Sequence, residues 1–95
     1  MDIEKKLKRQ ENFRRINYEL KNIISYNVKY YRTLKGITED ELGKCIGKTG
    51  EYIKKLENKQ FKANPPIDTL DMIARALEVR ISELICKDNT GRKNE

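Results

Sequence analysis

Residues 38–58 read TEDELGKCIGKTGEYIKKLEN, and this stretch predicts two short helices joined by a tight turn. Thr38 followed by Glu41 is a capping box, which marks the start of a helix. Gly47 can end that helix, because glycine accepts the left-handed backbone of a helix C-terminus at little cost. Thr49 is suited to cap the helix that follows.

Each of these two helices has one apolar side. Leu42 and Ile46 lie four residues apart in the first, and Ile53 and Leu56 lie three apart in the second. The opposite side of the second helix carries Gly50, Glu51, Lys54, Lys55 and Asn58. A helix that buries one side and shows lysines on the other is shaped to enter the major groove of DNA.

Five pieces of the chain, in order and spacing, carry a family resemblance between about residues 24 and 85. They are YYRTLKGIT, EDELGKCIG, KTGEYIKKLEN, IDTLDMIARALEV and ISEL. Together they resemble the Cro/lambda-repressor-like (XRE-type) helix-turn-helix DNA-binding family. The resemblance implies an all-α, five-helix lambda-repressor-like domain. It also implies a sequence-specific transcriptional regulator of bacterial or phage type, which binds double-stranded palindromic operators as a homodimer in the cytoplasm.

The resemblance and the chemistry of the side chains together give a set of expected DNA contacts. The expected base contacts are Gly50, Glu51, Tyr52, Lys54 and Lys55; the expected phosphate contacts are Arg32, Thr49, Asn58, Lys59 and Lys62. A glutamate can accept from the cytosine amino group, and a lysine can donate to guanine. Tyr52 has two interpretations, contact with a thymine methyl group or packing against the preceding helix.

The family also implies a structural ion pair between Arg32 and Glu57. A guanidinium can donate two parallel hydrogen bonds to a carboxylate while its remaining N–H groups face a phosphate. Some positions depart from the family pattern: Glu39 replaces a glutamine that donates to phosphate, and Gly50 replaces a side chain that often touches bases. Glu51 brings a further carboxylate toward the DNA.

Other departures concern packing and helix ends. Gly43 stands where alanine is usual, at the expected closest approach of the two helices. Glu78 stands where a helix-ending glycine is frequent, and Arg80 where a capping serine is common. These last two substitutions leave the geometry of that corner open.

The net charge of +6 is unevenly distributed along the 95 residues. Residues 1–22 hold seven basic and four acidic side chains, and residues 48–62 hold five and two, so each segment is +3. Residues 67–86 hold two basic and four acidic side chains, a net charge of −2. This distribution is typical of a polyanion binder whose C-terminal half lies away from the nucleic acid or forms a dimer contact.

We divide the chain into a charged, helical extension (1–22), a helix-turn-helix domain (23–86) and a polar tail (87–95). The extension can pack as an extra helix on the domain or on a dimer partner, reach DNA phosphates with its basic side chains, or remain a solvated tail. Asn22 or Ser25 is the expected break before the next helix. That helix, over residues 23–35, should stop at Gly36.

Apolar spacing predicts which side chains of the domain face inward. In the helix over 23–35 they are Ile24, Val28, Tyr31 and Leu34; in the helix that starts at residue 67 they are Ile67, Leu70, Ile73, Ala74 and Leu77. Ile81, Leu84 and Ile85 mark a short last helix. Pro65 and Pro66 close a basic loop in which Phe61 is expected to be partly buried.

Several function classes find no support in the sequence. Cys45 and Cys86 stand 41 residues apart in a chain without histidine, which is no zinc signature, and reduced thiols are expected. We expect no cofactor, small-molecule ligand, membrane span or secretory leader, and no enzyme activity, because no nucleophile–base pair or glycine-rich phosphate loop is present. The alternative function is a protein–protein interaction module, antitoxin-like or anti-repressor, that keeps the same fold.

Overall fold

The computed structural model describes the backbone of residues 3–87 and the side chains of residues 19–87. Over this range the chain is helical, with no strand. The helices are α1 (Ile3–Lys35), α2 (Glu39–Cys45), α3 (Gly50–Glu57), α4 (Ile67–Leu77) and α5 (Ile81–Leu84). The all-α, five-helix expectation is therefore confirmed, and the extension forms the first part of α1. The expected tail falls almost wholly on residues 88–95, outside the described residues.

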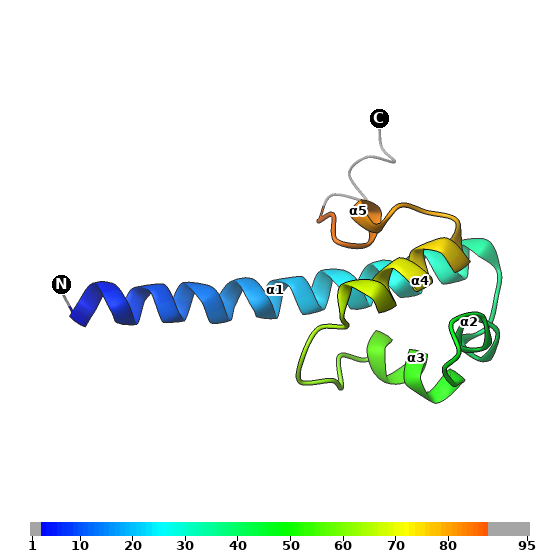
Figure 1. Ribbon diagram of the computed structural model, residues 1–95, viewed down its shortest axis with the longest axis horizontal. Helices are drawn as coiled ribbons and strands as arrows, with labels where there is room; N and C mark the ends of the chain where they lie inside the picture. The colour runs from blue at the N-terminus through cyan, green and yellow to red at the C-terminus, as the bar shows by residue number, and fades with distance from the viewer. Residues whose placement is uncertain (1–2, 88–95) are drawn as a thin grey trace.

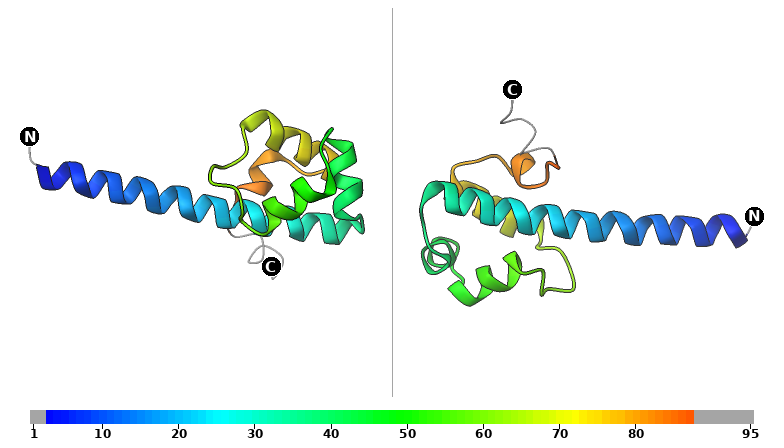
Figure 2. Two further views of the ribbon diagram at one scale, coloured as in Figure 1. Left: turned by 90° about the horizontal axis from the view of Figure 1, so that it is seen from below. Right: turned by 180° about the vertical axis from the view of Figure 1, so that it is seen from behind.

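The C-terminal half of α1 is the centre of the helical body (Figure 1). α2 and α3 lie on one side of it and α5 on the other, while α4 runs alongside and contacts α1, α2 and α5. The N-terminal half of α1 projects away from the body, which the two further views also show (Figure 2). The molecule is consequently elongated, with principal extents of 51 × 34 × 20 Å.

The core lies where these helices converge on α1. Every helix contributes buried apolar side chains to it: Ile24, Val28, Leu42, Ile46, Ile53, Leu56, Leu70, Ile73, Ala74, Leu77 and Leu84. Most of these were expected to face inward from their spacing alone. Phe61 is half-buried and packs against this core, as predicted.

The predicted break of the first helix at Asn22 or Ser25 is wrong, because α1 runs from Ile3 to Lys35 without interruption. Ser25, one of the two residues expected to break the helix, is instead held within it by a tertiary contact, whereas the buried Oδ1 of Asn22 has no hydrogen-bond partner among the described residues. The Ser25 hydroxyl donates to the carbonyl oxygen of Leu56 at 2.7 Å. Asn27, also buried, donates from Nδ2 to the carbonyl oxygens of Leu84 at 2.7 Å and Cys86 at 3.1 Å. These two residues fasten α3 and the end of α5 to α1.

Two side chains predicted to face inward are exposed. Leu34 is 69% exposed, since it lies about 120° around the helix from Val28. Ile67 is 67% exposed. It is the first residue of α4, and helical side chains lean toward the N-terminus, so this one extends beyond the helix that it begins.

The helix ends follow the predicted capping signals closely. At the start of α2, the Thr38 hydroxyl accepts from the Glu41 amide at 3.0 Å, and the Glu41 carboxylate accepts from the Thr38 amide at 2.8 Å. α1 and α2 are followed by Gly36 and Gly47, both at positive φ. The Thr49 hydroxyl caps α3 by accepting from the amide of Tyr52 at 3.1 Å. Local sequence therefore defines the turn between α2 and α3.

The corner between α4 and α5 keeps its geometry without glycine. Glu78 adopts the left-handed conformation itself, at φ 61° and ψ 40°. The amide of Val79 then donates to the carbonyl of Ala74 at 2.9 Å, which closes the end of α4. At the start of α5, the carboxylate of Glu83 accepts from the amide of Arg80 at 2.9 Å. This bond is the half of a capping box that the N3 glutamate supplies, and it does not depend on the side chain at the N-cap.

Candidate nucleic-acid interface

α2 and α3 approach each other most closely at Gly43. A Cβ atom on this residue would lie 2.5 Å from both the carbonyl carbon and the carbonyl oxygen of Thr49. No side chain fits in that space without a backbone shift, so glycine allows the start of α3 to lie directly against α2. The predicted close approach at this position is confirmed.

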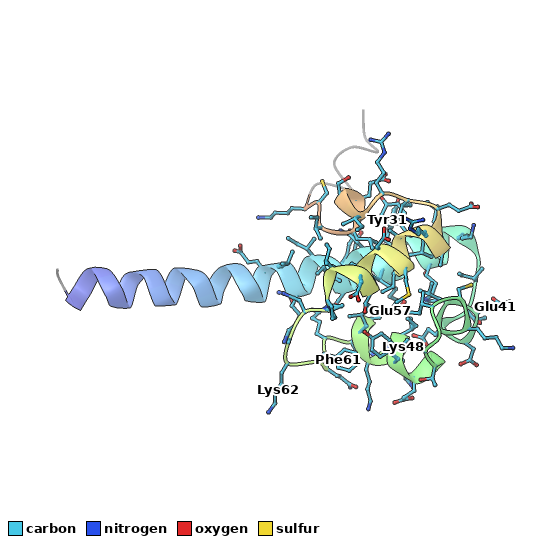
Figure 3. All side chains as sticks on the ribbon, viewed as in Figure 1. Tyr31, Glu41, Lys48, Glu57, Phe61 and Lys62 are labelled. Carbon is cyan, nitrogen blue, oxygen red and sulfur yellow. The ribbon has the colours of Figure 1, made fainter. Side chains whose placement is uncertain are left out.

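α3 divides into a buried and an outward face. Ile53 and Leu56 are buried in the core, and so is Glu57, which is 8% exposed. The opposite face is open to solvent over Glu51, Lys54, Lys55 and Asn58. Nothing else in the described part of the chain covers these lysines, and Figure 3 shows side chains of α3 extending away from the body.

An ion pair between Arg32 and Glu57 secures the end of α3 to α1. The guanidinium donates from Nε to Oε2 at 2.6 Å and from Nη2 to Oε1 at 3.0 Å, so the pair is bidentate. Nη1 donates to the carbonyl oxygen of Ile37 at 2.9 Å. The side chains of Arg32 and Glu57 are only 14% and 2% exposed. The pair implied by the family resemblance is thus present, and it compensates the buried carboxylate at the end of α3.

The charge state of this pair follows from its geometry. The pKa of Arg32 lies above its ordinary value, first because Glu57 accepts its hydrogen bonds, and also because the carboxylates of Glu57 and Glu39 attract the cation. Burial acts in the opposite direction and is outweighed. Since Nε, Nη1 and Nη2 all donate within the protein, little of the guanidinium is left for a phosphate.

The chain leaves α3 through a left-handed turn that directs it into the basic loop. Lys59 has φ 60°, and the amide of Gln60 donates to the carbonyl of Lys55 at 2.9 Å. This arrangement is a Schellman-type helix end, here formed without glycine. Lys59 and Lys62 are exposed, and Lys62 points away from the body in Figure 3.

Tyr52 is half-buried on α3 and packs against Phe61 of the loop. Their ring centroids are 5.0 Å apart at an interplanar angle of 42°. Burial raises the pKa of the Tyr52 hydroxyl. Of the two interpretations of this residue, the structure favours packing, although its partner is the loop and the core rather than the preceding helix alone.

Gly50 lies at the contact between α3 and α2. A Cβ atom there would meet the side chain of Asp40, so this position faces α2. Of the expected base contacts, Glu51, Lys54 and Lys55 therefore share the outward face, whereas Gly50 and Tyr52 lie beside it. Thr49, Asn58, Lys59 and Lys62 are exposed at the two ends of α3 and in the loop.

Sequence reasoning missed Lys48 as a residue of this surface. It is exposed in the turn before α3, and its Nζ lies 5.1 Å from the centroid of the Tyr52 ring. Lys48 precedes the N-cap of α3, so its four-residue spacing to Tyr52 is not the pattern within one helix that signals a side-chain pair. Residues 48–62 thus carry five exposed lysines, in the turn before α3, on α3 and in the loop after it: Lys48, Lys54, Lys55, Lys59 and Lys62.

The described residues lack the features of a membrane span or of a metal centre. Within residues 3–87 no helix is long and apolar enough to cross a bilayer. Across the described side chains no three histidine, cysteine, aspartate or glutamate residues gather as metal ligands would. Cys45, which is exposed, and Cys86 are both free thiols.

Comparison with known proteins agrees with this geometry. The helix-turn-helix family model matches residues 28–84, well over half of the chain. The chain is 30% identical over 77 residues to the control protein C.SmaI of Serratia marcescens, covering 81% of this chain and 87% of that protein. Its structure resembles the hypothetical transcription factor NHTF from Neisseria, with a TM-score of 0.70, 25% identity, and coverage of 80% and 85% of the two chains. The chain therefore belongs to the XRE-type helix-turn-helix family of DNA-binding transcriptional regulators.

Proposed function

We propose that this regulator recognises a specific duplex sequence by placing α3 in the major groove, and that it does so as a homodimer on a palindromic operator in the cytoplasm. Its mechanism is binding without catalysis. Regulation of transcription then follows from occupancy of the operator.

The outward face of α3 is the observation that carries this proposal. An α-helix fits the major groove, and Lys54 and Lys55 stand on the face that the core leaves free. Glu57 would repel phosphates if it were exposed, but it is buried and paired with Arg32. The surface around α3 thus keeps its positive charge where a duplex would meet it.

We divide the contacts by what each side chain can reach. The side chains that we propose to contact base edges are those of Glu51, Lys54 and Lys55. Gly50 has no side chain, so only its backbone can approach the DNA. Thr49, Asn58, Lys59 and Lys62 are the proposed phosphate contacts. Arg32 is better assigned to holding Glu57 than to binding phosphate, since three of its nitrogens already donate within the protein.

We infer a dimer because the family resemblance implies operators with two-fold symmetry. Two recognition helices reach successive major grooves when they lie about 34 Å apart, one turn of DNA. Large apolar side chains remain exposed on helices other than α3 and offer area for such a contact: Tyr26, Leu34, Ile67, Met72 and Ile85. Sedimentation of the full chain, with and without duplex, measures the stoichiometry directly.

Selection from a random duplex pool, followed by binding titrations, tests the recognition itself. We expect enrichment of a two-fold symmetric sequence that binds far more tightly than random duplex at the same salt concentration. Equal affinity for selected and random duplexes would remove sequence recognition. Failure to retain any duplex at low salt would remove DNA binding altogether, and would favour the protein-interaction alternative.

A further inference from the structure

Lys48 occupies an electrostatically unfavourable place unless an anion approaches it. It precedes Thr49, the N-cap of α3, so its ammonium group lies near the positive end of the helix dipole. Among the residues whose side chains the structure describes, no carboxylate forms an ion pair with it. Its partner is instead the face of the Tyr52 ring, 5.1 Å away. Aromatic faces attract cations, so this contact offsets part of the repulsion.

The ring that holds Lys48 is itself fixed from behind. Tyr52 packs on Phe61 with ring centroids 5.0 Å apart, and both side chains are half-buried against the core. A ring restrained on two sides rotates little, so the face that contacts Lys48 keeps one orientation. The ammonium group of Lys48 is therefore restrained even though the lysine is exposed.

Phe61 also connects this arrangement to the basic loop. It lies between Lys59 and Lys62, the two exposed cations that follow α3. Figure 3 shows Lys48, Phe61 and Lys62 along the edge of the molecule formed by α3 and the loop. The Tyr52–Phe61 contact therefore joins the side chain that holds Lys48 to the loop that carries Lys59 and Lys62.

We propose that Lys48 contacts the DNA backbone. Tyr52 and Phe61 are then positioning residues, which orient Lys48 and the loop lysines toward the phosphates. This inference rests on the proposed function, because it names further residues of the same surface. A phosphate is the anion that fits, since Lys48 lies in the turn before α3 and its ammonium group is over the Tyr52 ring rather than among Glu51, Lys54 and Lys55. Its contribution should then be independent of DNA sequence.

The first test measures the salt dependence of binding for Lys48→Ala on the selected and random duplexes. Losing one phosphate contact should reduce the slope of log K against log salt by about 0.9 per protomer, with a similar fold-loss of affinity on both duplexes. Lys87→Ala, which removes an exposed lysine after α5, the helix on the opposite side of α1 from α3, is the matched control and should leave the slope unchanged. An unchanged slope for Lys48→Ala overturns the inference, whereas failure of the unaltered chain to bind any duplex overturns the proposed function.

The second test asks whether the rings position the lysine. The effect of Lys48→Ala is measured again in the Tyr52→Phe and Tyr52→Leu backgrounds, well below the thermal midpoint of each. Tyr52→Phe keeps the aromatic face and should preserve the full effect; Tyr52→Leu should reduce it strongly. Phe61→Leu should give a partial reduction, and it replaces Tyr52→Leu as the test if that variant does not fold. A full Lys48→Ala effect in the leucine backgrounds overturns the positioning role.

Discussion

Gly43 has a stronger steric constraint than its place within a helix suggests. Alanine is favoured over glycine by about 1 kcal/mol inside helices, so local propensity alone predicts that Gly43→Ala stabilises the protein. The structure predicts the opposite sign, since the new methyl group would meet backbone atoms of Thr49 at 2.5 Å. Overpacking of this kind costs about 1–3 kcal/mol. We expect Gly43→Ala to lower the free energy of unfolding by about 1 kcal/mol net, measured by urea denaturation.

Gly50→Ala is the control for that experiment. Its methyl group would meet mainly the side chain of Asp40, which is exposed and able to move, and would lie 3.0 Å from the Cα atom of that residue. The substitution should therefore cost less stability than Gly43→Ala. If Gly43→Ala were as stable as the unaltered chain, the start of α3 could not lie directly against α2 at this position.

At the scale of helices, the Arg32–Glu57 pair joins α1 to α3. Removing one partner leaves the other charge poorly compensated and mostly buried, so Arg32→Ala and Glu57→Ala should each cost about 2–3 kcal/mol. The double variant loses the pair only once, and its cost should be smaller than the sum of the single costs. A double-mutant cycle by chemical denaturation measures this difference. Strict additivity would show that the two side chains do not interact in solution.

The end of α4 offers a test of backbone strain. Glu78 holds a left-handed conformation that disfavours any residue with a Cβ atom. The Glu78 carboxylate also accepts from the Lys35 ammonium group at 2.8 Å, in an exposed ion pair. Glu78→Gly should raise the thermal midpoint by a few degrees, even though it removes this ion pair. Glu78→Ala removes the same ion pair and keeps the strained conformation, so it should produce no such rise. Equal midpoints for the two variants would contradict a strained helix end.

At the scale of the whole molecule, the sequence predicted local structure better than packing between distant segments. Thr38, Thr49 and Gly47 define their turns through neighbours within a few residues, and each was correctly assigned. Ser25 was one of two expected break positions, but its hydroxyl bonds to a carbonyl 31 residues away within a continuous helix. Asn27 likewise acts through a partner 57 residues away, which local patterns do not show. The exposure of Leu34 is a different kind of miss, because the angle of about 120° from Val28 follows from the spacing itself.

The same contrast applies to the DNA-binding surface. Helical periodicity identified Lys54 and Lys55 because they lie on one face of one helix. Lys48 was missed, since its importance depends on Tyr52 and on Phe61, which the chain brings back after α3 ends. The role of Arg32 also depends on three-dimensional geometry, because only the structure shows that most of its donors are already engaged.

The most direct test of the account compares DNA affinity and thermal stability in one variant, Lys54→Ala/Lys55→Ala. Both lysines are exposed, so their removal should leave the thermal midpoint nearly unchanged while affinity for the selected duplex falls strongly. The Lys87→Ala variant, measured in parallel, should match the unaltered chain in both respects. Undiminished affinity in the double variant, or a large loss of stability in its place, would contradict the claim that this face of α3 meets DNA.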